Sequence, residues 1–153
     1  MEGKDEIIKL RKLSQLYAYT SIQMHEAVGR TAGMSGTDHK YLGFLLQKGQ
    51  MTAGELSNLT GLTTGAVTGL IDRFEKKKLV KRQFDKDDRR KIIIVPNTKK
   101  IMAIFEPLYE EFQDKTDGIM GSFSTEELKS LESYFLKALK LMNETTNKLN
   151  NKN

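Results

Sequence analysis

The feature that most constrains the fold is the order of four short segments between Thr52 and Val95. Two helix-type segments come first, and each opens with a threonine that can cap a helix and carries apolar residues at three- and four-residue spacing. Gly61 separates them, and two β-type runs follow, 79–84 and 91–95, with a charged stretch between them. Helix, turn, helix and ribbon in this order is typical of a winged helix-turn-helix lobe.

The second of these short helices, from Thr63 to about Lys77, is predicted to have one buried and one exposed face. Four apolar residues follow the i, i+3, i+4, i+7 pattern of a buried stripe: Val67, Leu70, Ile71 and Phe74. Helical geometry then turns another set outward: Gly65, Thr68, Gly69, Asp72 and Lys76, with Thr64 and Arg73 on the flanks. We expect Lys76 to hold the Asp72 carboxylate, since the two are four residues apart.

The two glycines of this exposed face need an explanation, because each weakens a helix by roughly 1 kcal/mol relative to alanine. One explanation is the close approach of a large partner such as DNA. The other is that both glycines pack against the preceding helix. The sequence leaves both open.

Longer helices are predicted on both sides of the lobe. An N-terminal helix covers 5–28, and a second begins at Ser35, where Asp38 completes a capping pattern. A helix over 99–117 contains Pro107, which removes a backbone bond and is expected to kink it. The last helix opens at Ser124 with a capping box and carries an apolar seam.

These terminal helices carry more apolar surface than one small lobe can bury, which favours a subunit interface. The residues expected there are Leu10, Leu13, Leu128, Leu131, Phe135 and Met142. We therefore expect one mainly α domain over 1–153 with a two- or three-stranded β wing. Its winged lobe covers 35–96, and the dimerisation helices cover 5–30 and 98–149.

Composition excludes several classes of protein. The chain has no cysteine, so thiol chemistry, disulfides and thiolate metal sites are excluded. No apolar run reaches membrane-spanning length and no signal sequence is recognisable, which predicts a cytoplasmic protein without membrane contact. A net charge of +5, with basic residues concentrated from Arg73 to Lys91, favours an anionic partner.

The segments 62–80 and 85–90 together resemble the multiple-antibiotic-resistance regulator (MarR) family. The resemblance covers the helix order of the whole chain and is sharpest over 35–95, where 37–40 also looks like one branch of that family. Lys78 departs from the pattern, since the family often has glycine there. This departure concerns the local turn geometry.

The resemblance implies a DNA-binding homodimer in which the first, fifth and sixth helices interlock. It also implies a wing in which Arg90 enters the minor groove while Asp88 holds it in place. The expected DNA contacts are Thr63, Thr64, Gly65, Ala66, Thr68, Gly69, Arg73, Lys76, Asp88, Arg89, Arg90 and Lys91. Arg89 and Lys91 are equally compatible with a solvated hairpin tip.

Many relatives have an effector cleft between their dimer and DNA lobes, and a small aromatic or anionic effector would bind there. The candidate residues are Tyr17, Met24, His25 and Phe44. A role of His25 in the core or interface is the alternative. Two isolated histidines without cysteine do not indicate a metal site, and no cofactor is expected.

We interpret the chain as a sequence-specific regulator that binds double-stranded DNA, with repression inferred from family habit alone. The alternative is a winged-helix module that contacts another protein instead of DNA. No nucleophile–base pair and no phosphate-cradling glycine-rich loop is present, so an enzyme is not expected.

Overall fold

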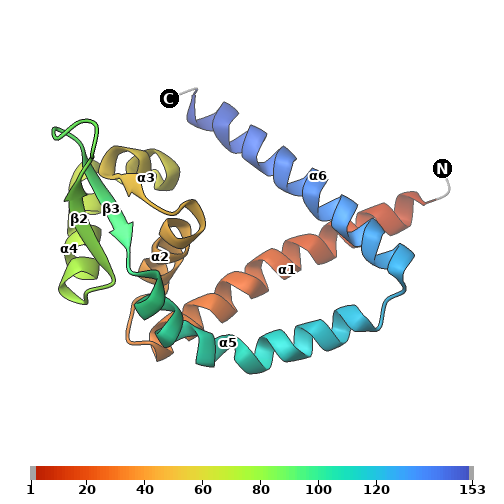
Figure 1. Ribbon diagram of the computed structural model, residues 1–153. Helices are drawn as coiled ribbons and strands as arrows, with labels where there is room; N and C mark the ends of the chain where they lie inside the picture. The colour runs from red at the N-terminus through yellow and green to blue at the C-terminus, as the bar shows by residue number, and fades with distance from the viewer. Residues whose placement is uncertain (1–2, 152–153) are drawn as a thin grey trace. The chain divides into compact units, whose positions relative to one another are not determined.

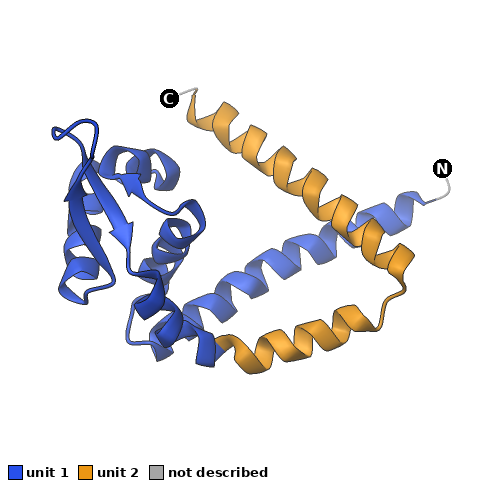
Figure 2. Cartoon of the chain, viewed as in Figure 1, with its two compact units in different colours: residues 1–108 blue, residues 109–153 orange. Residues whose placement is uncertain are grey.

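The computed structural model describes residues 3–151 and divides into two compact units, one ending at Leu108 and the other beginning at Tyr109 (Figures 1 and 2). The first unit contains α1 (Lys4–Thr31), α2 (Gly36–Lys48), β1 (Met51–Thr52), α3 (Ala53–Thr60), α4 (Thr64–Lys76), β2 (Val80–Phe84), β3 (Ile92–Pro96) and the first part of α5 (Thr98–Gly121). The second unit contains the rest of α5 and α6 (Thr125–Asn150). Apart from β1, the element order is the predicted one.

Four helices begin where the sequence places a capping side chain. The hydroxyl oxygens of Ser35, Thr52, Thr63 and Ser124 each accept a hydrogen bond from the backbone N–H three residues on. At Thr52 and Ser124 the capping box is complete, because Glu55 and Glu127 accept from the backbone N–H of the capping residue. Satisfying these N–H groups fixes each helix start.

The core of the first unit is built around the predicted stripe of α4. Val67, Leu70, Ile71 and Phe74 are all at most 1% exposed, which confirms the inward face. Other helices, the sheet and the turn before β2 supply the remaining large, fully buried side chains: Leu42, Leu45, Leu56, Leu79, Ile94 and Ile101. Burial of this apolar surface is the main favourable term in folding of the unit.

The wing belongs to a three-stranded antiparallel sheet with strand order β1-β3-β2. Strand β3 is central, because Ile94 lies opposite Arg82 on one side and Met51 on the other. The two-residue β1 is not predicted by any alternation of side chains, since Thr52 serves both as its second residue and as the cap of α3. The sequence predicts two or three strands, and the sheet has three.

Helices α1 and α2 approach closely through two glycines. A Cβ atom on Gly29 would lie 2.8 Å from the Cβ of His39, and one on Gly36 would lie 2.7 Å from the Cβ of Glu26. These distances are shorter than any side chain tolerates. Glycine is therefore required where the two helices cross.

Helix α1 is longer than predicted at both ends, and α5 runs from Thr98 to Gly121 where 99–117 was predicted. Pro107 lies inside α5 and is exposed, so the carbonyl of Ala103 has no N–H of residue 107 to accept from. The boundary between the two units falls one residue later, after Leu108.

In the second unit, no described residue of α6 is buried. No described helix is both long enough and apolar enough to cross a bilayer.

Candidate nucleic-acid interface

Helices α3 and α4 are joined by a turn that local hydrogen bonds close on both sides. Gly61 has a φ of 72°, in the left-handed region, and its N–H donates to the carbonyl of Ser57. The Ser57 hydroxyl donates to the carbonyl of Leu62 at 2.6 Å, and the Thr63 hydroxyl accepts from the N–H of Ala66 at 3.2 Å. Because these bonds bridge the turn, they fix where α4 starts relative to α3.

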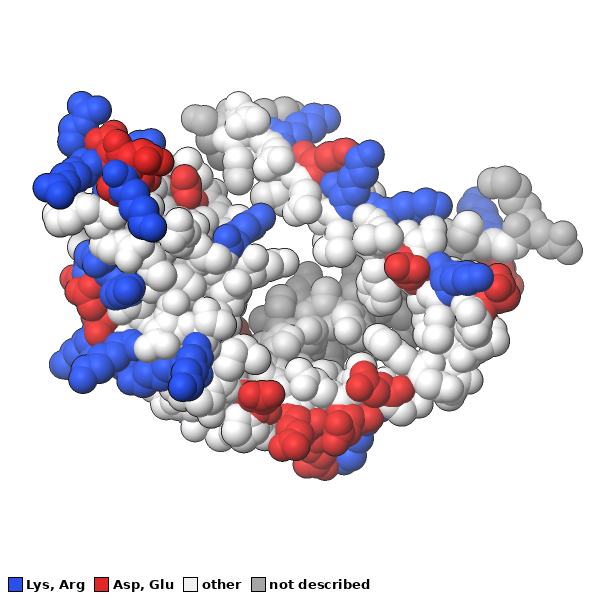
Figure 3. Space-filling model, in the orientation of Figure 1, with Lys and Arg blue, Asp and Glu red and all other residues white. Residues whose placement is uncertain are grey.

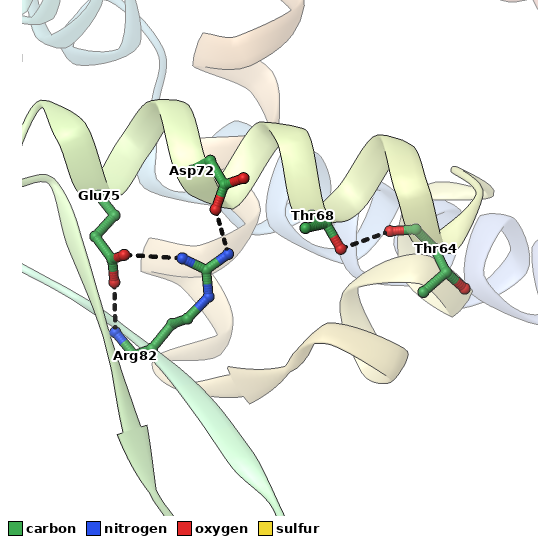
Figure 4. Close-up of polar contacts among 5 residues, drawn as sticks. All are labelled: Thr64, Thr68, Asp72, Glu75 and Arg82. Atoms are coloured by element: carbon green, nitrogen blue, oxygen red, sulfur yellow. Dashed lines mark hydrogen bonds and ion pairs between the residues drawn. The ribbon is translucent and has the colours of Figure 1, made fainter.

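The outward face of α4 carries hydroxyl groups and very small residues. Thr64, Gly65, Ala66 and Thr68 are all exposed. The Thr68 hydroxyl donates to the carbonyl of Thr64 at 3.0 Å (Figure 4). Its proton is thus used within the helix, but its oxygen retains acceptor capacity toward a partner.

Neither glycine of this face packs against α3, so that explanation is wrong. A Cβ atom on Gly65 would meet nothing within 4 Å. On Gly69 it would meet only the Nη1 atom of Arg73, at 3.6 Å. Nothing within the described part of the chain therefore requires glycine at these two positions.

Arg73 is paired with an acidic residue of another helix. Its Nε and Nη2 atoms donate to the two carboxylate oxygens of Asp38, each at 2.9 Å. This two-bond pair lowers the pKa of Asp38 below its ordinary value. The Arg73 side chain is still 57% exposed, so it lies at the surface between α2 and α4.

The predicted pairing of Asp72 with Lys76 is wrong, because Asp72 binds Arg82 of β2 instead (Figure 4). The Arg82 Nη2 atom lies 2.6 Å from Asp72 Oδ1, and Nη1 lies 2.8 Å from Glu75 Oε1. A guanidinium held on a strand can reach both carboxylates at once. An ammonium on the flexible stem of Lys76 offers no such fixed fork.

At the wing tip, Asp88 and Arg90 form a local cluster. The Arg90 backbone N–H and its Nε atom donate to Asp88 Oδ1, at 3.0 and 3.1 Å, and Nη2 lies 3.4 Å from Oδ2. These bonds from Arg90 lower the pKa of Asp88. The Arg90 side chain is 91% exposed, so it projects into solvent while remaining tethered.

The other basic residues predicted to bind DNA are exposed on the same unit: Lys76, Arg89 and Lys91. In the space-filling view, Lys and Arg side chains gather over the hairpin tip and over the end of α4 (Figure 3). A surface of this kind attracts an anionic partner.

The predicted effector residues lie on α1 and α2. Met24 and Phe44 are half-buried, whereas Tyr17 and His25 are exposed. The Phe44 ring lies 6.3 Å from that of Tyr41, between centroids. Two surface hollows of this unit, of about 750 and 430 Å³, are lined by other residues and by none of these four.

The predicted dimer residues lie outside the core of either unit. Leu10 and Leu13 on α1 are at least half-exposed, as is Met142 on α6. Leu128 and Phe135 are also exposed, and Leu131 is partly exposed.

Among the described residues, no group of three or more His, Asp or Glu side chains is placed to hold a metal ion. His39 stacks on Phe105 at 4.4 Å between ring centroids, and burial lowers its pKa.

Two residues important for this surface, Arg82 and Asp38, are missing from the set predicted by sequence. Arg82 could have been found, because it shares a strand face with the buried Val80 and must therefore point toward the lobe. Asp38 could not have been found from sequence, because it lies 35 residues from its partner Arg73.

Comparison with known proteins gives consistent matches. A family model described as MarR family matches residues 32–91. Over 132 residues the chain is 39% identical to YcgE of Bacillus subtilis, an uncharacterised HTH-type transcriptional regulator, and the match covers 84% of this chain and 83% of that protein.

Two solved structures are similar over most of the chain. One is a MarR family protein from Bacillus stearothermophilus, 27% identical, with a TM-score of 0.72, covering 94% of this chain and 99% of that one. The other is a mutant of E. coli MarR complexed with operator DNA, 24% identical, with a TM-score of 0.55, covering 88% of this chain and 96% of that one. The second likeness concerns the fold alone.

Proposed function

The chain belongs to the MarR family of transcription regulators, and from that premise we propose that it is a repressor that occupies specific double-stranded operator DNA. The observation that carries the proposal is the tethered, 91% exposed Arg90 at the wing tip. A guanidinium suits the narrow, strongly negative minor groove because it is weakly hydrated. Its bonds to Asp88 limit its freedom before DNA arrives, which reduces the ordering cost of binding.

In this proposal α4 enters the major groove. Its outward face offers the Thr64 and Thr68 hydroxyls to base edges or phosphates. Thr63, Gly65, Ala66 and Gly69 allow close approach, because none of them has a long side chain. Lys76, Arg89 and Lys91 contribute charge toward phosphates. The E. coli protein complexed with operator DNA, which has a similar fold, supports DNA binding by this chain.

We propose that the protein acts as a homodimer through its N- and C-terminal helices, residues 5–30 and 98–149, with residues 35–96 as the DNA-binding lobe. The support is the exposed apolar surface of α1 and α6. A twofold dimer places half-sites about one helical turn, roughly 34 Å, apart or at a multiple of that spacing.

We also propose that a small aromatic or anionic effector releases the protein from DNA. Its candidate site is Tyr17, Met24, His25 and Phe44. An effector releases DNA only if it binds the DNA-incompetent arrangement more tightly, since equal affinity for both arrangements shifts nothing. Like the regulators of its family, the protein is proposed to work in the cytoplasm and not as an enzyme.

The test of DNA binding is a titration at several salt concentrations with the wild type and with Arg90→Ala. The duplexes are one selected by the wild type from a random-sequence library and a scrambled duplex of the same length. We expect Arg90→Ala to weaken binding and to reduce the salt slope by about 0.9. Preference among sequences should survive, except at narrow A·T steps.

Two further variants separate the contacts. Asp88→Ala should give a milder form of the Arg90 defect, because it frees the arginine without removing it. Thr68→Ala should instead change which bases are preferred, by about 1 to 3 kcal/mol where a base contact is lost. If Arg90→Ala left affinity and salt slope unchanged, the wing would not lie on DNA. A wild type that binds no duplex would favour the protein-interaction module.

A further inference from the structure

Helix α4 is the recognition helix of the proposed function, and it carries negative charge beside the face that would lie against DNA. Asp72 and Glu75 are both on α4, and their side chains are 61% and 45% exposed. Duplex DNA carries one negative charge per about 1.7 Å of its axis. Two unneutralised carboxylates at this position would oppose the approach of the helix to any sequence.

Both carboxylates are held by a single side chain from the wing. The guanidinium of Arg82 lies 2.6 Å from Asp72 through Nη2 and 2.8 Å from Glu75 through Nη1 (Figure 4). The backbone N–H of Arg82 adds a third bond, to the other oxygen of Glu75, at 3.2 Å. Both Asp72 and Glu75 are therefore fixed to β2, and the guanidinium donates to each of their carboxylates.

The backbone of Arg82 is held in place by the sheet. It lies opposite Ile94, which is 1% exposed, and it shares a strand face with the buried Val80. Its side chain is 28% exposed, less than half the exposure of Asp72. An arginine free to contact a phosphate would instead project, as Arg90 does with its 91% exposure.

We propose that Arg82 is a positioning residue for DNA recognition, which halves the negative charge of Asp72 and Glu75 and fixes them to the wing without itself contacting DNA. This inference rests on the proposed function. It gives the wing a second role besides the contact of its tip. The recognition helix can then present hydroxyls and glycines to the duplex, because its acidic groups are drawn toward β2.

Arginine is required at this position because two carboxylates three residues apart must be bridged. The planar fork of a guanidinium offers donors in two directions, whereas an ammonium acts as one point charge. With Arg82 in place, the three side chains sum to one negative charge. Without it they carry two, and both are free to move toward the duplex.

The test is a mutant cycle on DNA binding that compares four proteins: wild type, Arg82→Gln, Asp72→Asn/Glu75→Gln, and the triple variant. Affinities are measured at low salt for the selected and the scrambled duplex, at a temperature where circular dichroism shows each protein to be folded. We expect Arg82→Gln to weaken binding about tenfold on both duplexes, because exposed carboxylates repel phosphates whatever the sequence. The double variant should bind at least as tightly as the wild type.

The decisive comparison is the effect of Arg82→Gln when the carboxylates are absent. If Arg82 acts through them, this effect should shrink from about tenfold to about threefold or less, which is a coupling of at least about 0.7 kcal/mol. Arg82→Lys, which keeps the charge but not the fork, should fall between the wild type and Arg82→Gln. This variant also serves if Arg82→Gln does not fold.

Three outcomes would overturn the inference. An equal loss in both backgrounds would mean that Arg82 contacts DNA directly. A loss of thermal stability with unchanged affinity of the folded protein would mean a role in stability alone. A wild type that binds neither duplex would remove the proposed function and this inference with it, whereas either of the first two outcomes leaves DNA binding itself intact.

Discussion

Lys78 adopts a backbone conformation that normally belongs to glycine. Its φ is 57°, and it is the only non-glycine residue of the described chain with a positive φ. It follows the end of α4, where its N–H donates to the carbonyl of Glu75 and the N–H of Leu79 donates to the carbonyl of Phe74. This is the Schellman arrangement, in which glycine usually takes the position of Lys78.

Replacing Lys78 with glycine should therefore stabilise the fold. A left-handed conformation costs an ordinary residue about 1 to 2 kcal/mol, and part of this is offset because glycine has more freedom in the unfolded chain. We expect a net gain of about 0.5 to 1 kcal/mol in the free energy of unfolding, measured with urea. Lys76→Gly, two residues earlier and inside the helix, is the control and should destabilise by a similar amount. A loss of stability in Lys78→Gly would contradict the assigned geometry.

The Arg73–Asp38 pair makes a second residue-scale prediction, which concerns pH. Arg73 lowers the folded-state pKa of Asp38 below its unfolded value. The folded state therefore binds fewer protons at Asp38, so the contribution of the pair is complete above the unfolded pKa, near 4, and is lost as pH falls through the folded pKa. Arg73→Gln should lower stability by about 0.5 to 1 kcal/mol at pH 7, a value kept small because Arg73 is exposed to solvent.

Below pH 4 the difference between Arg73→Gln and wild type should shrink, because the wild type loses the same interaction on protonation. Urea titrations at pH 7 and near pH 3 measure it. Arg89→Gln, at the exposed wing tip, is the matched control and should change stability at neither pH. A difference that stays constant with pH would mean that Arg73 stabilises the fold through an interaction other than its ion pair with Asp38.

Helix caps and ion pairs differ in how well they can be predicted from sequence. Ser35, Thr52, Thr63 and Ser124 are recognisable as caps because a cap acts on the backbone three residues away. The ion-pair partners of Arg73 and Asp72 cannot be recognised from sequence, because ion pairs depend on which elements meet in space. Sequence favours Lys76 for Asp72 only because it is the cation four residues further along the same helix face.

At the scale of elements, α4 is predicted closely because its signal is periodic. Its four buried residues define a face, and the opposite face follows from geometry. Strand β1 is not predicted, because two residues cannot show alternation and its pairing with β3 is decided by the sheet. The two glycines of α4 gain meaning only from the structure, since no neighbour within the described chain requires them.

Gly65→Ala should therefore separate stability from function. Alanine favours the helix by up to about 1 kcal/mol, and its methyl group meets open space in the free protein. If DNA approaches α4 closely, the same methyl group should weaken binding to the selected duplex by about tenfold, equal to about 1.4 kcal/mol of steric cost. Unfolding in urea and a DNA titration measure the two effects.

The control is Gly43→Ala on α2, where an added Cβ also meets nothing within 4 Å. It should stabilise the fold without altering DNA affinity, because the proposed interface does not include that surface. If Gly65→Ala bound DNA as tightly as Gly43→Ala, close approach at α4 would be excluded as the reason for glycine.

At the scale of the whole molecule, the apolar residues divide into two populations. The buried ones all lie between Met34 and Phe105, whereas those of α1 and α6 remain largely exposed within one chain. Exposed apolar surface of this extent marks an interaction site in a folded protein. The heptad-like seam of α6 is predicted from sequence, but its partner is not, because a seam specifies a face and not what covers it.

The dimer proposal predicts that Leu131→Glu/Phe135→Glu should dissociate the protein. Both residues lie on the seam of α6, and twofold symmetry places each substitution in the interface twice. Since burying one such side chain contributes about 1.5 to 3 kcal/mol, the dissociation constant should rise at least about a hundredfold, by about 3 kcal/mol or more. DNA affinity should fall with it, because half-sites are then bound singly. Sedimentation velocity at micromolar concentration measures the mass.

Ser133→Glu is the control, because it adds one glutamate charge about 160° away around α6 from both Leu131 and Phe135, given about 100° per residue. It should leave both the sedimentation coefficient and DNA affinity unchanged. If the wild type itself sedimented as a folded monomer at micromolar concentration, the exposed seam would have another partner. DNA recognition would then have to proceed one lobe at a time, without the fixed half-site spacing that a twofold axis imposes.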